Sequence, residues 1–162
     1  MNRVIIPFYR NGQLIYWQAR SILPTEKKRY DNSPNSRDAV MYNMDKLTQY
    51  TDLPLFCTEG VFDAMPLDGI ATLGSKLTEA QKILLAKSPR RKIFVIDKDK
   101  NGRHMAEEVL SLGYEITFAP EGATDVNKSV QRFGIIWTVH ELMKNIPKNA
   151  DDARVKINLN CI

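Results

Sequence analysis

The sequence has little cysteine and histidine and lacks any long apolar run. Two cysteines, Cys57 and Cys161, and two histidines, His104 and His140, occur among its 162 residues. So few ligands supply neither a disulfide framework nor a four-cysteine zinc site. No apolar run approaches the roughly 18 residues of a membrane span, and the N-terminus lacks the apolar core of a signal peptide. We therefore expect a cytoplasmic protein without membrane association or bound zinc.

The charged residues are more informative in their distribution than in their number. The chain carries 23 Lys and Arg residues against 19 Asp and Glu residues, a net charge of +4. Between Lys76 and Arg103 there are nine basic residues and three acidic ones, and a second basic cluster lies at Lys27-Lys28-Arg29. Such clusters attract phosphate groups. The sequence therefore indicates a nucleotide or nucleic-acid partner.

Strand-like and helix-like segments alternate through the second two-thirds of the chain. Short apolar runs occupy residues 55–58, 70–73, 93–96 and 116–118. The helical patterns that follow them occupy residues 61–67, 78–87, 102–112 and 125–133. This alternation predicts an α/β fold with a mostly parallel sheet flanked by helices. Two further helices are expected at residues 44–50 and 136–146.

A small β-rich leader is expected before the α/β region. Apolar segments at residues 4–9 and 13–22 flank Asn11-Gly12, which is a strong hairpin signal. A polar loop follows, with a short strand expected near Arg29-Tyr30. We divide the chain into three parts: a basic leader over residues 1–50, the α/β domain over residues 51–147, and a polar tail over residues 148–162.

Acidic residues follow three of the predicted strands, at the ends where parallel sheets collect functional groups. Glu59 and Asp63 follow the first strand, Asp97 and Asp99 the third, and Asp125 the fourth. In extended backbone Asp97 and Asp99 point to the same side, and with Glu59 they offer the oxygen ligands that suit Mg²⁺ or Mn²⁺. A structural role is the alternative for each acid, because an aspartate in this position often caps the next helix.

Several of these segments resemble a known domain. Residues 58–63 (Thr-Glu-Gly-Val-Phe-Asp) and 96–99 (Ile-Asp-Lys-Asp), with the following Gly102-Arg103, resemble the Toprim domain of bacterial and phage-type DNA primases, topoisomerases and some nucleases. Residues 71–75 and 118–127 resemble further primase segments. Residues 29–34 are similar to the stretch just upstream of the primase Toprim domain, which favours the primases within the superfamily.

The resemblance implies divalent-metal-dependent synthesis of short RNA primers from ribonucleoside triphosphates on a single-stranded DNA template. It implies that Glu59, Asp97 and Asp99 are catalytic and bind Mg²⁺ or Mn²⁺, with Asp63 and Asp125 as additional metal ligands. The residues implied in nucleotide and nucleic-acid binding are mostly basic: Arg20, Arg29, Tyr30, Asn32, Lys76, Lys98, Lys100 and Arg103.

Primases of this type usually carry a zinc-binding module and a helicase or helicase-binding domain, and neither pattern occurs in this sequence. We therefore expect a minimal catalytic core, of the kind a bacteriophage would encode, that works in the host cytoplasm with a replicative helicase or another replisome protein. Two alternatives stay open. One is a Toprim nuclease that uses the same acids, and the other is a non-catalytic accessory subunit of a split primase.

Overall fold

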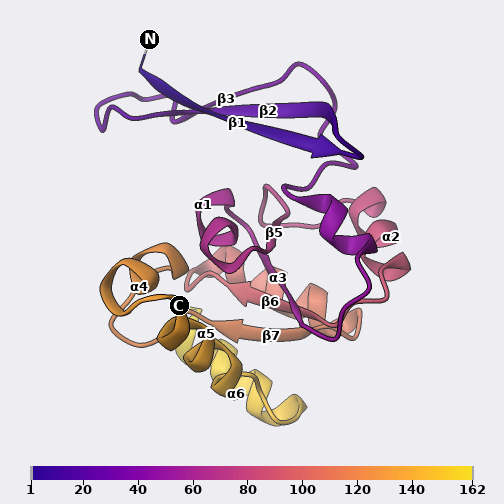
Figure 1. Cartoon of the computed structure of the whole chain (residues 1–162). Helices are drawn as coiled ribbons and strands as arrows, with labels where there is room; N and C mark the ends of the chain where they lie inside the picture. The colour runs from indigo at the N-terminus through magenta and orange to yellow at the C-terminus, as the bar shows by residue number, and fades with distance from the viewer. Residues whose placement is uncertain (1, 162) are drawn as a thin grey trace.

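The computed structural model describes residues 2–161, which form two separate β-sheets (Figure 1). The first is the leader sheet, with antiparallel strands β1 (Arg3–Arg10), β2 (Gln13–Ser21) and β3 (Tyr30–Asn32) in that order. Asn11 and Gly12 connect β1 to β2 with positive φ angles of 50° and 78°. Positive φ at both central residues is what a tight hairpin turn of this hand requires, so the predicted hairpin is confirmed.

The second sheet is parallel, as the alternating pattern predicted. Its spatial order is β5-β4-β6-β7. The strands are β4 (Leu55–Thr58), β5 (Ile70–Ala71), β6 (Lys92–Ile96) and β7 (Glu115–Phe118). All residues of β4, β5 and β6 are buried, which explains why these strands appear in the sequence as continuous apolar runs.

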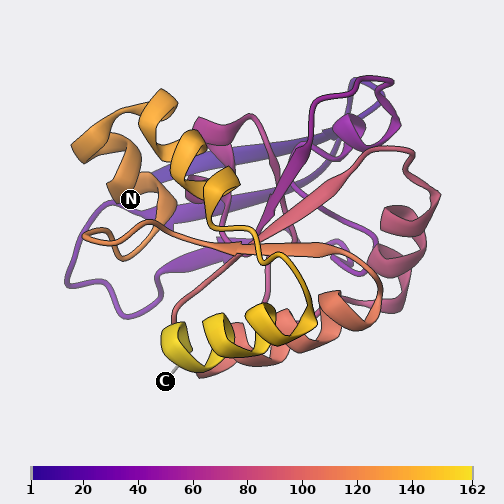
Figure 2. The ribbon, with the colours of Figure 1, turned by 90° about the horizontal axis from the view of Figure 1, so that it is seen from below.

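Helices cover both faces of the parallel sheet (Figure 2). The α-helices are α1 (Val61–Ala64), α2 (Glu79–Lys87), α3 (Lys100–Ser111), α4 (Val126–Phe133), α5 (Ile135–Lys144) and α6 (Ala150–Asn160), and two 3₁₀ turns lie at η1 (Met44–Thr48) and η2 (Met65–Leu67). Helices α2, α3 and α6 pack on the face that carries Cys57 and Phe94. Helices α4 and α5 pack on the opposite face, against Phe56 and Val95.

Two helix boundaries follow directly from local sequence. At the start of α2, the Thr78 hydroxyl accepts the Gln81 amide at 3.1 Å, and the Gln81 side chain accepts the Thr78 amide at 3.1 Å. This capping box pairs two amides that would otherwise lack partners at the helix start. At the end of α3, Gly113 has a φ of 80°, a left-handed conformation that glycine adopts at little cost.

The leader sheet packs against the Toprim-like half of the chain through an apolar cluster. Ile6, Phe8 and Tyr16 of the leader contact Val61 and Ala64 of α1 in this cluster. The Phe8 and Tyr16 rings meet edge to face, with their centroids 5.5 Å apart. The leader is therefore held close to the carboxyl edge of the parallel sheet, just beyond β4.

The last residues differ from the expected polar tail. They form α6, which begins where the Asn149 side chain accepts the Asp152 amide at 2.9 Å. Ala153, Ile157 and Cys161 are buried in the main core. Their spacing of four residues is a helical signal, but the charged and polar residues between them concealed it. Among residues 2–161, no helix is long and apolar enough to cross a bilayer.

Candidate active site at the carboxyl edge of the parallel sheet

The two strand-end acids Glu59 and Asp97 leave the parallel sheet at the same edge. Glu59 follows β4 directly and Asp97 follows β6, and these strands are parallel neighbours. Burial, and then repulsion from four other carboxylates, raises the pKa of Asp97 to about 7; these carboxylates belong to Glu59, Asp63, Asp99 and Asp125. Burial, followed by repulsion from Asp99, also raises the pKa of Glu59. The other four predicted acids therefore lie within electrostatic range of Asp97.

Two of the acids also cap helices, as the structural alternative predicted. Asp99 Oδ1 accepts the Gly102 amide at 2.8 Å at the start of α3. Asp125 Oδ1 accepts the Lys128 amide at 2.7 Å at the start of α4. Burial opposes ionisation of Asp125, but hydrogen bonds from Lys128 and Thr124 outweigh it and lower the pKa of this carboxyl. The capping bonds use the Oδ1 atom in both residues.

Asp63 connects the first strand end to α4. Its Oδ1 atom accepts the backbone amide of Asn127 at 2.9 Å. The pKa of Asp63 is raised, chiefly by burial and, among the charges, by repulsion from Asp125, which exceeds the opposing effect of Arg20. Asp63 therefore holds the start of α4 against α1, and it lies within electrostatic reach of the leader.

The donor set fits a divalent cation in its chemistry. No three His, Cys, Asp or Glu side chains within residues 2–161 already stand at metal-binding separations. Burial, and then repulsion from neighbouring carboxylates, nevertheless raises the pKa values of Glu59 and Asp97. A hard cation would relieve this repulsion, and carboxylate oxygens are its preferred ligands. Glu59 and Asp97, joined by Asp99, are the residues that would hold it.

A glycine fixes the loop that carries Asp97 and Asp99. A Cβ atom at position 102 would lie 1.9 Å from the backbone oxygen of Asp97. The first turn of α3 can pack this closely on the end of β6 only because residue 102 has no side chain. Gly102 therefore sets the position of Asp97 relative to α3.

The four basic residues predicted to bind phosphate in the α/β half, Lys76, Lys98, Lys100 and Arg103, differ in exposure and in their partners. Lys98 is half-buried, and burial lowers its pKa against an opposing effect of Glu121. Lys76 and Lys100 are exposed and free to contact phosphate. Arg103 instead donates to Asn158 Oδ1 at 2.9 Å and to the Cys161 carbonyl at 3.2 Å. The structure thus uses the Arg103 guanidinium to hold α6.

Three of the predicted leader residues, Arg20, Tyr30 and Asn32, lie on one face of the leader sheet. Arg20 pairs with Tyr30, and Gln18 pairs with Asn32, across the antiparallel β2 and β3 strands. Directly paired residues share a face, so these four side chains project together. Arg20 donates to the Tyr30 hydroxyl at 2.7 Å, and Gln18 donates to Asn32 Oδ1 at 3.0 Å.

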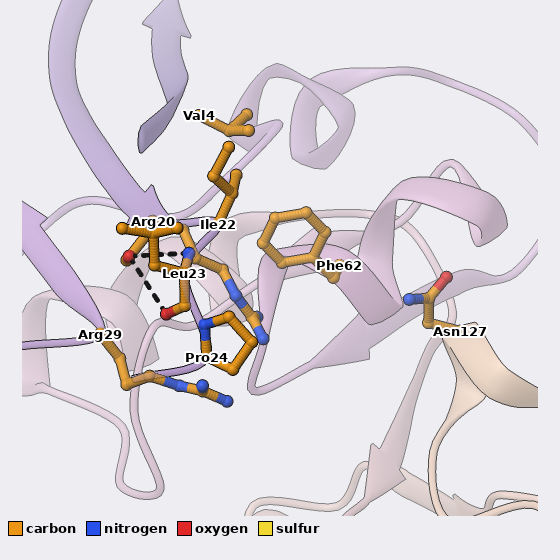
Figure 3. A pocket seen from close by; sticks show the side chains of 9 residues that line it. Val4, Arg20, Ile22, Leu23, Pro24, Arg29, Phe62 and Asn127 are labelled. Carbon is orange, nitrogen blue, oxygen red and sulfur yellow. Dashed lines mark hydrogen bonds between the residues drawn. The ribbon is translucent and has the colours of Figure 1, made fainter. Parts of the chain in front are cut away.

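Arg20 on this face and Phe62 of α1 line a hollow of about 510 Å³ between the leader and α1 (Figure 3). The Arg20 guanidinium lies 4.6 Å from the centroid of the Phe62 ring and 5.3 Å from that of Tyr30. Arg29 and Asn127 also line the hollow. Phe62 belongs to α1, between Glu59 and Asp63, so α1 joins the cationic leader face to the acids.

Comparisons with known proteins agree with this architecture. Residues 56–129 match the Toprim-like family. The α/β half of the chain therefore carries a Toprim-like domain. The DNA primase of Aquifex aeolicus (strain VF5) is 30% identical over 93% of this chain, and the match covers 35% of that protein. The chain therefore spans about a third of the length of this relative.

Solved primase structures share the fold of the Toprim domain and the leader. A DNA primase domain from Pseudomonas aeruginosa superposes with a TM-score of 0.72 at 24% identity, covering 90% of this chain and 51% of that one. The RNA polymerase domain of Mycobacterium tuberculosis primase DnaG, in complex with a DNA oligomer with an overhang, gives a TM-score of 0.76 at 19% identity. That match covers 97% of this chain and 57% of the other.

Three residues around the site were not among the predicted ones. Phe62 supports Arg20, Asn127 anchors Asp63 and lines the hollow, and Gln18 bonds to Asn32. Gln18 could have been found because it precedes Arg20 by two positions on a strand, and therefore shares its face. The contact of Phe62 with Arg20 joins residues 42 positions apart in the chain and had no local signal.

Proposed function

We propose that this chain is a primase catalytic core that synthesises short RNA primers on single-stranded DNA, using ribonucleoside triphosphates and Mg²⁺ or Mn²⁺. One observation carries the proposal. The acids around Asp97 include Asp63, which lies within electrostatic range of Arg20 on the leader face. Primer synthesis needs both kinds of surface together, because cations must bind phosphates while carboxylates hold the metal.

In this proposal three acids are the main metal ligands and two are additional ones. Glu59, Asp97 and Asp99 hold the metal, whereas Asp63 and Asp125 are additional ligands that also fix the start of α4. The bound metal would make the attacking 3′-hydroxyl more acidic and neutralise charge on the departing pyrophosphate. Lys98, Lys100 and Lys76 bind the triphosphate or the template phosphates. Because Arg103 is bonded to α6, we assign it to positioning that helix in this mechanism.

The leader face binds the template and incoming nucleotide in this proposal. Arg20 and Arg29 contact phosphates, while Tyr30 and Asn32 contact bases or sugars. The DNA complex of the Mycobacterium tuberculosis primase supports DNA as the template class. We further propose that the chain acts in the cytoplasm, in a phage-infected host, with a replicative helicase or another replisome protein.

The test is a primer-synthesis assay on single-stranded DNA with labelled ribonucleotides, with and without Mg²⁺ or Mn²⁺. We expect short metal-dependent RNA products that disappear in Asp97→Asn. Asp151→Asn, at a fully exposed position of α6, is the matched control and should retain activity. Products that persist in Asp97→Asn would contradict the assigned site. Loss of the DNA strand without synthesis would replace this proposal with the nuclease alternative. If the protein shows neither synthesis nor cleavage, the accessory-subunit alternative would be favoured.

A further inference from the structure

The bend between α4 and α5 exposes an apolar patch that the proposed reaction does not use. Phe133, Ile135, Ile136 and Trp137 form this elbow patch, which lies around Gly134. Ile136 is 85% exposed, and the other three side chains are each more than a third exposed. Together with His140 they line an open depression of about 650 Å³. Clustered exposed apolar side chains of this kind mark protein-binding surfaces.

The elbow patch lies outside the three apolar clusters that form the core of residues 2–161. The inner faces of α4 and α5 are already buried, with Val126 and Leu142 packed against the parallel sheet. The hydroxyls of Ser129 and Thr138 bond at 2.8 Å and join the two helices, and Thr117 donates to the Leu142 carbonyl at 2.7 Å. The helices are therefore fixed from the inside, while the patch faces outward.

The two aromatic side chains of the elbow patch, Phe133 and Trp137, are positioned by contacts within the chain. The Phe133 and Trp137 ring centroids lie 4.3 Å apart. The Arg132 guanidinium lies 4.9 Å from the centroid of Phe133 and also donates to the Gly122 carbonyl at 2.9 Å. Rings that are already ordered lose little side-chain entropy on binding, and tryptophan and phenylalanine are frequent anchors of interfaces.

Lys144 and Arg132 border the elbow patch with basic side chains, and His140 lies between Ile136 and Lys144. His140 and Lys144 follow Ile136 at successive four-residue steps along the exposed face of α5, and Arg132 lies at its α4 side. The neighbouring acid, Glu141, has a side chain only 19% exposed and is paired with Lys144 at 3.3 Å. A partner that covers this surface would therefore meet an apolar centre and a cationic border.

We propose that the elbow patch docks an acidic amphipathic helix of a partner protein. Apolar residues on one face of that helix would cover Ile136 and Trp137, and its acidic residues would face Arg132 and Lys144. A second copy of this chain fits less well, because a two-fold contact would bring the same cations together. Nucleic acid also fits less well, because phosphates would leave Ile136 without an apolar contact. This inference does not depend on the proposed primer synthesis.

The test selects ligands from a displayed library of helical peptides. Apolar residues occupy one face of each peptide, and the polar positions vary among Glu, Gln and Lys. We expect wild-type protein to enrich Glu-rich peptides, and Ile136→Glu to bind the selected peptide at least tenfold more weakly. Ile83→Glu, at a half-exposed position on α2, is the matched control and should bind as wild type does. Both positions are exposed, so we expect circular dichroism to show folded variants.

The fluorescence of Trp137 tests directly whether the selected peptide binds at the elbow patch. In a Trp17→Phe background, Trp137 is the remaining tryptophan, and its emission should shift to shorter wavelength when the selected peptide binds. Several results would overturn the proposal: no enrichment, enrichment of Lys-rich peptides, equal enrichment on Ile136→Glu, or an unchanged Trp137 emission. Sedimentation showing a dimer that Ile136→Glu dissociates would assign the patch to self-association instead.

Discussion

The leader face and the acidic edge lie within electrostatic range of each other through Arg20 and Asp63, yet the two regions differ in how their charged groups are paired. Arg20 in the leader has a hydroxyl partner in Tyr30 and lies over two aromatic rings. Glu59 and Asp97 at the acidic edge are placed beside other carboxylates, and their pKa values are raised. The contacts of Arg20 with Tyr30 and Phe62 stabilise the fold without any ligand. Repelling groups cost stability until a cation binds, which is why such clusters occur at functional sites.

Substituting Gly102, which packs directly on the loop that carries Asp97, should have the largest effect on the acidic edge. In Gly102→Ala the new methyl group would collide with the Asp97 backbone oxygen, so the end of β6 and the start of α3 must separate. We expect a loss of roughly 2–4 kcal/mol in the free energy of unfolding. Urea denaturation measures this loss. Gly74→Ala is the matched control, because nothing lies within 4 Å of its added methyl group; equal losses in both variants would refute the explanation.

Neutralising Asp97 should stabilise the metal-free protein. Because part of Asp97 is open to solvent, screening reduces the effect, and we expect Asp97→Asn to gain roughly 1 kcal/mol at pH 7.5. The pKa of Asp97 is raised to about 7 in the folded state. The folded protein therefore retains a proton that the unfolded chain releases near pH 4, so this residue makes stability fall as the pH rises from about 4 to about 7.

Urea denaturation in EDTA across this pH range measures the Asp97 effect. As the pH rises over this range, the free energy of unfolding should fall less in Asp97→Asn than in wild type. Asp125→Asn sharpens the contrast, because the pKa of Asp125 is lowered by the bonds of its cap. This variant should be less stable at neutral pH, and its loss relative to wild type should shrink in acid. Equal destabilisation by both substitutions would show that Asp97 is a structural acid like Asp125.

The smallest expected effect concerns Phe62, which connects the two regions. Phe62→Leu removes one of the rings over Arg20 but keeps an apolar residue on α1. A cation–π contact at such a site contributes about 0.5–1 kcal/mol, so we expect two- to fivefold weaker binding of single-stranded DNA. Fluorescence anisotropy with a labelled oligonucleotide measures the change. Phe62→Tyr keeps a ring and should bind as wild type does; a loss as large as that of Phe62→Leu would exclude the role of the ring.

The sequence was sufficient for the order of elements before α6 and for the placing of acids at the strand ends. Fully buried strands require unbroken apolar runs, so β4 and β6 were recognisable, and Glu59 and Asp97 followed them. Parallel strands end at a common edge, so the topology made these acids neighbours. The hairpin and the capping box were predictable for a similar reason, because each depends on residues close together in the chain.

The tertiary structure alone decided which predicted groups are free and which are already bonded. Arg103 and Asn158 lie 55 positions apart, and only the docking of α6 makes them partners. The contact between Phe62 and Arg20 likewise depends on how the leader packs on α1. Sequence periodicity encodes the face that each element buries, but contacts between distant elements arise when those faces pack together. The sequence therefore determined where the acids and cations emerge, and packing determined which of them remain available for a ligand.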